Sequence, residues 1–193
     1  MKALTTTELL KVLKIASENK RNHAAILLAV KHGMRISEVC NLKMTDLDIT
    51  NNQITVRRLK GSLTTTQPLD DIAGQPLLSE RRVLRAWLKE RADWQNRDGW
   101  VFPSQKGQNL TRFGLLQMFR SVCERAGIPK PKRHFHVLKH TLGYTLAEQN
   151  TSVEVIKQKL GHKNVSSSII YSLPSSDTAN RIADTAFAQA FRQ

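Results

Sequence analysis

Residues 136–171 read HVLKHTLGYTLAEQNTSVEVIKQKLGHKNVSSSIIY, and this stretch decides which fold the chain adopts. Its apolar residues recur at helical spacing over about 136–149 and again over 152–160. Gly161 is placed to end the second helix, and a short stretch then leads to Tyr171. The segment therefore predicts two consecutive helices that carry histidines and lysines, followed by a tyrosine.

The residues before this segment also favour helices. Thr5 and Glu8 have the spacing of a capping box ahead of an apolar run. The second helix is expected from about Asn22 to Gly33, and the third from near Ser37. Other helices are expected over 79–92, over 112–126 with Thr111 as its N-cap and Gly127 as its C-cap, and, after Tyr171, over 176–190.

Residues 46–69 have a different character. Turn signals at Asn51-Asn52 and at Lys60-Gly61 separate short β-prone runs. We expect three antiparallel strands here, with Lys60 at or near the second turn. The predicted fold class is therefore α+β, mainly α-helical, with a small three-stranded antiparallel sheet.

The charge of the chain indicates its kind of partner. Thirty Lys and Arg residues against sixteen Asp and Glu give a net charge of +14 over 193 residues, with a pI near 10.2. Such an excess favours a polyanion, above all nucleic acid, over a ribosomal, membrane-surface or merely soluble role. The longest apolar run, residues 24–30, is far shorter than the ~18 residues of a membrane span. We expect a cytoplasmic protein without a membrane partner, whose Cys40 and Cys123 are buried, reduced thiols.

Five features of the sequence carry groups suited to chemistry at a phosphate. They are GMRISEVCNL (33–42), RRLKGSLTTTQPL (57–69), HVLKHT (136–141), KLGHKN (159–164) and the nine-residue step from His162 to Tyr171. In order and spacing they resemble the catalytic domain of the tyrosine recombinases, the family of phage integrases, Xer-type resolvases and fimbrial phase-variation invertases. The resemblance runs from about residue 5 to 190 and is greatest to the short fimbrial invertases.

The resemblance implies a site and an activity. It implies a catalytic domain over 1–175 and a C-terminal helix over 176–193 that is exchanged between subunits; packing of that helix on its own domain is the alternative. The implied enzyme is a site-specific recombinase that cleaves and rejoins duplex DNA through a 3′-phosphotyrosyl bond, in integration, excision or inversion, with no metal or other cofactor. The implied catalytic residues are Arg35, Lys60, His136, Lys139, His162 and Tyr171, supported by Glu38 and His140.

The resemblance also implies partners. The chain would bind double-stranded DNA at inverted half-sites, as a homotetramer on DNA and as a monomer or weak oligomer when free. This places it with the nucleoid. The spacing of His136 and His140 also suits a metal, but no glutamate lies between them and no third ligand is evident.

Elementary chemistry gives each implied residue a task. Arg35 offers a planar fork for two phosphate oxygens, whereas Lys139 offers a point charge. His162 can donate a hydrogen bond to the same phosphate. Tyr171 is a poor nucleophile at its ordinary pKa, so its proton needs an acceptor, for which His136 is suited. Lys60 can protonate the leaving 5′-oxygen.

Lys139 departs from the family pattern, which has arginine at this position. Lysine keeps the charge but loses the two-pronged grip. We expect an active enzyme because the other implied residues are intact. The alternative is a catalytically weak DNA-binding regulator with the recombinase fold, and a type IB topoisomerase-like enzyme is a third reading that the match of HVLKHT and KLGHKN disfavours.

Overall fold

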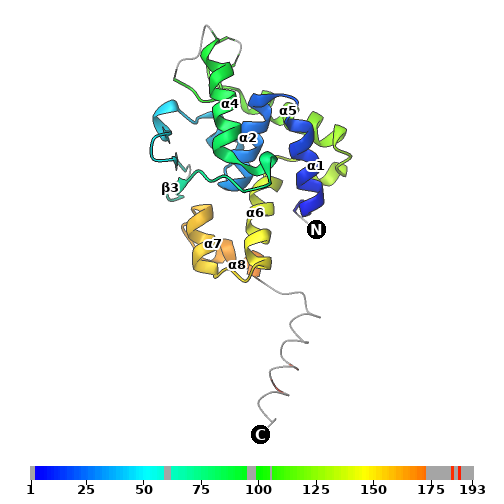
Figure 1. Cartoon of the computed structure of the whole chain (residues 1–193). Coiled ribbons are helices and arrows are strands. Elements are labelled where there is room, and N and C mark those ends of the chain that lie inside the picture. Colours follow the sequence, from blue (N-terminus) through cyan, green and yellow to red (C-terminus); the bar gives the residue numbers. More distant parts are fainter. Residues whose placement is uncertain are drawn as a thin grey trace.

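The computed structural model describes residues 3–58, 62–94, 99–104 and 106–172, together with Asp184 and Phe187. The helices are α1 Thr6–Ala16, α2 Lys20–Lys31, α3 Ile36–Cys40, α4 Glu80–Ala92, α5 Arg112–Arg125, α6 Val137–Glu148, α7 Val153–Leu160 and α8 Ser166–Ser172, with 3-10 turns η1 Met44–Asp46, η2 Pro76–Leu78 and η3 Lys130–Lys132. The strands are β1 Leu47–Asp48, β2 Gln53–Val56 and β3 Thr65–Pro68. Figure 1 shows most helices gathered around α2, with α7 and α8 at one end.

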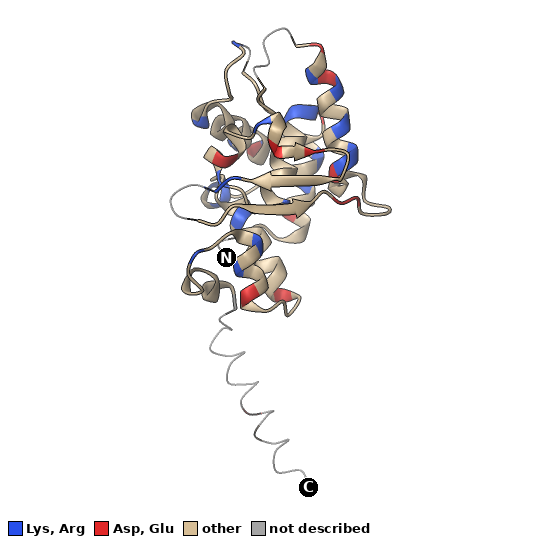
Figure 2. Cartoon of the chain, turned by 90° about the vertical axis from the view of Figure 1, so that its left-hand side faces the viewer, with Lys and Arg blue, Asp and Glu red and all other residues tan. Residues whose placement is uncertain are grey.

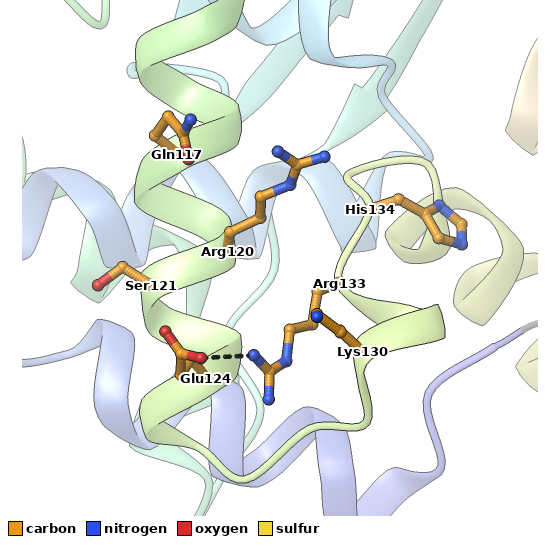
Figure 3. Close-up of a pocket in the computed structure, with 7 residues that line it drawn as sticks. All are labelled: Gln117, Arg120, Ser121, Glu124, Lys130, Arg133 and His134. Carbon is orange, nitrogen blue, oxygen red and sulfur yellow. Dashed lines mark hydrogen bonds and ion pairs between the residues drawn. The ribbon is translucent and has the colours of Figure 1, made fainter.

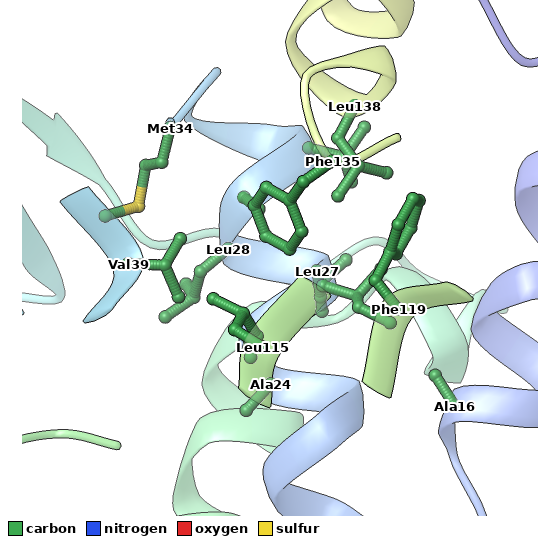
Figure 4. Close-up of a cluster of buried hydrophobic side chains, with 14 of the residues drawn as sticks. Ala16, Ala24, Leu27, Leu28, Met34, Val39, Leu115, Phe119, Phe135 and Leu138 are labelled. Atoms are coloured by element: carbon green, nitrogen blue, oxygen red, sulfur yellow. The ribbon is translucent and has the colours of Figure 1, made fainter. Parts of the chain in front are cut away.

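The core is built around α2. Its residues 23–30 are all buried, and the helix contacts α1, α4, α5 and α6. Figure 4 shows how side chains from α1, α2, α5 and α6 meet, with Phe119 of α5 close to Phe135, the residue before the HVLKHT segment. Their rings pack edge to face with centroids 5.3 Å apart. The start of α6 is therefore held by the main core.

Local signals explain where several helices begin and end. The Thr5 side chain accepts from the Glu8 backbone N–H while the Glu8 carboxylate accepts from Thr5 N–H, which confirms the predicted capping box. Thr111 caps α5 as expected. Gly161 ends α7 with φ +64°, a conformation that favours glycine. Asn19 caps α2, which begins at Lys20 rather than near Asn22.

The sheet has three antiparallel strands, as predicted, in the order β1-β2-β3, and Figure 2 shows it in front of the helices. Alternation along β2 turns Ile54 and Val56 into the core, and the next residue of that series, Arg58, is also buried. Lys60, in the connection from β2 to β3, lies outside the described residues. The predicted helix over 176–190 also lies outside them, apart from Asp184 and Phe187.

One element differs from the sequence prediction. Tyr171 lies in helix α8 and not in an irregular stretch. The segment SSSIIYS is rich in serine and β-branched isoleucine, which are weak helix formers, so its own propensity does not predict a helix. Contacts with α6 and α7 stabilise it instead.

Two further expectations concern thiols and membranes. Cys40 and Cys123 are both free and buried, as predicted. No helix in the described part of the chain has the length and apolar character that crossing a membrane requires.

Candidate active site

Tyr171 is packed tightly between α8 and α6. It is 5% exposed, and its ring lies directly against Gly143 of α6. A Cβ atom at position 143 would come within 2.6 Å of the tyrosine ring, so only glycine fits there. The Tyr144 ring meets Tyr171 edge to face, with centroids 5.2 Å apart. Position 143 therefore fixes how closely the tyrosine approaches α6.

The hydroxyl of Tyr171 faces a histidine of α6. Its oxygen lies 3.2 Å from His140 Nδ1. His136 lies one turn earlier and packs edge to face on His140, with ring centroids 4.7 Å apart. Burial, with a smaller contribution from Tyr144, raises the pKa of Tyr171 to about 12 despite the opposing charge of Arg35. At neutral pH the hydroxyl is therefore protonated, and the basic nitrogen within its reach is that of His140, whereas the sequence predicts His136 as the proton acceptor.

His162 is oriented by a residue on the helix of the tyrosine. Its Nδ1 lies 2.9 Å from the hydroxyl oxygen of Ser168, which is fully buried. The His162 ring lies nearly parallel to that of Tyr171, at an interplanar angle of 14° and a centroid distance of 6.4 Å. Burial and the charges of Lys139 and Arg35 lower the pKa of His162 to about 4. The imidazole is neutral at pH 7, with Nδ1 engaged by Ser168, and within the described part of the chain Nε2 makes no hydrogen bond.

Arg35 is held by Glu38 immediately before α3. Arg35 NH1 donates to Glu38 Oε1 at 2.9 Å, and the Arg35 backbone N–H donates to Oε2 at 2.8 Å. Burial alone would raise the pKa of Glu38. The hydrogen bonds from Arg35 and the charge of Arg58 outweigh this effect and lower the pKa below its usual value, so the carboxylate stays charged. The Arg35 side chain is 33% exposed. A fixed guanidinium thus remains accessible to a ligand.

Lys139 lies deeper than Arg35. It is 1% exposed, and its Nζ donates to the Leu160 carbonyl oxygen at 2.7 Å. Burial and the charges of Arg58 and Arg35 lower its pKa to about 7, against the opposite effect of Glu38. At neutral pH the neutral amine and the ammonium form of Lys139 are therefore both populated, and an added anion would favour the ammonium form.

The predicted residues meet in one place. The rings of His136, His140, Tyr171 and His162 form a continuous series of contacts. Lys139 bonds to the Leu160 carbonyl, two residues before His162, and Arg35 is connected to the same end of α7 through Glu38 and Arg58. Desolvation, followed by the charges of His140 and Lys139, lowers the pKa of His136 to about 4. Of the implied catalytic and supporting residues, only Lys60 lies outside the described part of the chain.

Three residues of the site are not among those that the motifs imply: Arg58, Ser168 and Gly143. Arg58 extends the inward series of β2, and an arginine in an apolar register is a signal of a buried ionic contact. Gly143 stands inside a helix, where glycine costs roughly 0.5–1 kcal/mol and so indicates a close approach. Ser168 carries no such signal, because nothing in the sequence predicts α8.

A basic pocket of about 590 Å³ lies between α5 and η3. It is lined by Gln117, Arg120, Ser121, Glu124, Lys130, Arg133 and His134. Figure 3 shows the ion pair in which Arg133 NH1 donates to Glu124 Oε1 at 2.7 Å. The side chains of Arg120 and Lys130 make no hydrogen bond or ion pair with the rest of the described chain. His134, which lines the pocket, stands two residues before His136 of the candidate site.

Known proteins share this sequence and architecture. Residues 2–176 match the model of the phage integrase family. Type 1 fimbriae regulatory protein FimE of Escherichia coli K12 is 36% identical over 153 residues, which cover 78% of this chain and 73% of FimE. Among solved structures, XerA recombinase superposes with a TM-score of 0.76 at 24% identity, covering 99% of this chain and 64% of XerA. XerH bound to palindromic difH in a post-cleavage complex gives 0.76 at 22% identity, covering 95% of this chain and 52% of XerH.

The comparisons of sequence and of structure both cover the candidate site. The matched residues include Arg35, the α6 motif, His162 and Tyr171, and the fold is that of recombinase catalytic domains. The chain therefore belongs to the phage integrase family, the family of the tyrosine recombinases.

Proposed function

We propose that Tyr171 cleaves duplex DNA at a specific site and holds the cut strand as a 3′-phosphotyrosyl ester until a second strand replaces it. The observation that carries this proposal is the placement of Tyr171, buried and neutral, beside His140 and His162 within the field of Arg35. A nucleophile, candidate proton acceptors and a cation are thus gathered around one position. We therefore assign the chain the activity of a site-specific recombinase of its family.

The reaction balances without an external reagent. The Tyr171 oxygen forms a bond to phosphorus while the bond from phosphorus to the 5′-oxygen breaks. The tyrosine proton passes to a histidine of α6: His140 is within reach in the DNA-free chain, and His136 is the acceptor if DNA redirects the hydroxyl. We assign the proton for the leaving 5′-oxygen to Lys60. Attack by a 5′-hydroxyl of the partner strand reverses these steps and seals the new junction.

Cations stabilise the charge that grows on the non-bridging oxygens. Arg35 grips the phosphate with its accessible fork, and His162 donates from Nε2. Lys139 now donates one of its three N–H groups to Leu160 O, which leaves two for a phosphate oxygen. The bound phosphate raises the pKa of Lys139 and keeps it charged during the reaction.

Three features support DNA as the substrate. The net charge is +14, the pocket between α5 and η3 is lined by Arg120, Lys130 and Arg133, and the structural neighbour XerH is bound to a palindromic DNA site. We propose inverted half-sites, a homotetramer on DNA, and a monomer or weak oligomer when free, in association with the nucleoid. In this proposal residues 1–175 form the catalytic domain, and 176–193 form a helix exchanged between subunits.

The test uses nicked suicide duplexes tiled across the DNA that flanks the gene. Cleavage near the nick releases a short fragment that carries the 5′-hydroxyl and diffuses away. The strand then cannot be rejoined, so the covalent intermediate is trapped and survives denaturing electrophoresis. The parent protein is expected to give an adduct on a few tiles that share an inverted repeat, and Tyr171→Phe none, with unchanged DNA affinity because only a hydroxyl is lost. Absence of an adduct on every tile, or an adduct formed by the Phe variant, would contradict the proposal.

A further inference from the structure

The end of α7, directly before His162, is held by groups from distant parts of the chain. The Lys159 carbonyl oxygen accepts from Arg58 NH2 at 3.2 Å and from Gln67 Nε2 at 3.1 Å. The Leu160 oxygen accepts from Lys139, and the Gly161 oxygen accepts from the backbone N–H of Leu63. The last carbonyls of a helix have no donors within that helix, and they attract cations. This helix end is therefore a fixed anchor.

Arg58 connects this anchor to the rest of the site. Its side chain is 0% exposed. NH1 donates to Gly33 O at 2.8 Å and to Glu38 Oε2 at 3.0 Å, while NH2 donates to His32 O at 2.7 Å and to Lys159 O. A Cβ atom at Gly161 would come within 2.8 Å of Arg58 Nε. One guanidinium thus joins the α2–α3 connection, Glu38 and the end of α7.

Glu38 links this guanidinium to Arg35. Its Oε1 accepts from Arg35 NH1, and its Oε2 accepts from both Arg35 N–H and Arg58 NH1. Without Arg58 the buried carboxylate would lose a partner on Oε2 and could rotate or attract another cation. The direction in which the Arg35 fork points therefore depends on Arg58, although Arg58 itself has no exposed surface.

Stability alone does not account for a buried arginine here. Replacing a buried ion pair by well-packed apolar residues is often neutral or stabilising. An apolar residue would also continue the inward series of Ile54 and Val56. What an apolar residue cannot do is hold a carboxylate at a fixed place and angle.

We propose that Arg58 is a positioning residue for strand cleavage: anchored on the α2–α3 connection and the end of α7, it holds Glu38, which aims Arg35 at the scissile phosphate. This inference rests on the proposed function. Displacement of a reacting or binding group by about 1 Å can cost about 10²-fold in rate. Arg58→Met should therefore slow adduct formation by about that factor, with DNA affinity close to that of the parent.

The decisive experiment is a double-mutant cycle in single-turnover adduct formation, with DNA affinity and thermal unfolding measured beside it. If Arg58 acts through Arg35, Arg58→Met slows the parent strongly but slows the Arg35→Ala variant little. Independent roles would give losses that multiply. Arg58→Lys should be slow as well, since an ammonium cannot span the four acceptors.

Two further variants keep the test informative. Glu38→Gln preserves shape and should reproduce the Arg58→Met defect without adding to it, which covers the case in which Arg58→Met folds poorly. Arg57→Gln is the matched control: the neighbouring arginine is 68% exposed, pairs with Asp46, and should cleave like the parent. Multiplying losses in the cycle, or parent-like cleavage by Arg58→Met, would overturn the inference. A parent that forms no adduct would instead overturn the proposed function, and this inference with it.

Discussion

The active site joins two regions that differ in how they are built. Arg35 and Glu38 stand on the large core around α2, whereas Tyr171 belongs to a small separate cluster with Ile156 and Leu160. Figure 1 shows α6 running from the main bundle to α7 and α8. Arg35 and Glu38 are thus fixed on the main core, whereas Tyr171 sits on a small unit joined to the rest through α6 and through the bonds of Arg58, Gln67 and Leu63 to the end of α7. Regions with few buried contacts open at lower free energy.

A large effect is expected from disturbing the packing of the small cluster at Gly143. In Gly143→Ala the added Cβ would meet the Tyr171 ring at 2.6 Å, so the tyrosine must move. We expect adduct formation to fall by about 10²-fold, as for a 1 Å misplacement, while DNA affinity and the unfolding of the main core change little. Thr145→Ala, at an exposed site on the same helix, is the control. Parent-like cleavage by Gly143→Ala would show that the tyrosine position is set elsewhere.

A smaller loss is expected at Ser168, which orients His162 from within α8. Ser168→Ala removes one hydrogen bond, worth about 0.5–1.5 kcal/mol, or up to roughly 10-fold in rate. Ser168→Thr keeps the hydroxyl and should keep most of the activity. Single-turnover cleavage measured on both variants checks this, and equal rates for Ala and parent would remove Ser168 from the account.

The pH dependence of cleavage tests the role of Lys139. The pKa of Lys139 lies near 7, lowered by burial and by Arg58 and Arg35, with Glu38 opposing them. If its ammonium form serves cleavage, the rate falls as pH rises through and above 7, at a point moved upward by bound phosphate. Lys139→Arg, which stays charged, should lose that decline. A decline that persists in the Arg variant would point to another group.

Much of this architecture could be predicted from the sequence. Capping signals and apolar periodicity predicted α1, α5, α6 and α7, and turn residues predicted the sheet. The motifs named residues that the fold does connect, through the ring contacts of His136, His140, Tyr171 and His162 and through the hydrogen bonds of Lys139 and Glu38. Helix α8 could not be predicted, because tertiary contacts and not propensity stabilise SSSIIYS. The contact of Tyr171 with His140 depends on the position of that helix, so the sequence favoured His136 instead.

The smallest effect on chemistry is expected at the basic pocket. Arg120→Ala and Lys130→Ala should weaken DNA binding and reduce the slope of log K against log salt by about 0.9 for each phosphate that the variant no longer neutralises. The rate of cleavage at saturating protein should stay near that of the parent, because neither side chain is among the implied catalytic residues. An unchanged salt slope in both variants would place the DNA elsewhere.

Lys139 tests the central claim most directly, because it is the residue by which this chain departs from the family pattern. The measurement is single-turnover adduct formation on a suicide substrate by the parent, Lys139→Ala and Lys139→Arg. We predict that the parent cleaves, that the Ala variant is slower by about 10²–10³-fold, as for loss of a preorganised donor, and that the Arg variant cleaves at least as well as the parent. Equal rates for Ala and parent would remove Lys139 from the active site. A parent that never cleaves beside an Arg variant that does would show that this chain binds DNA without recombining it.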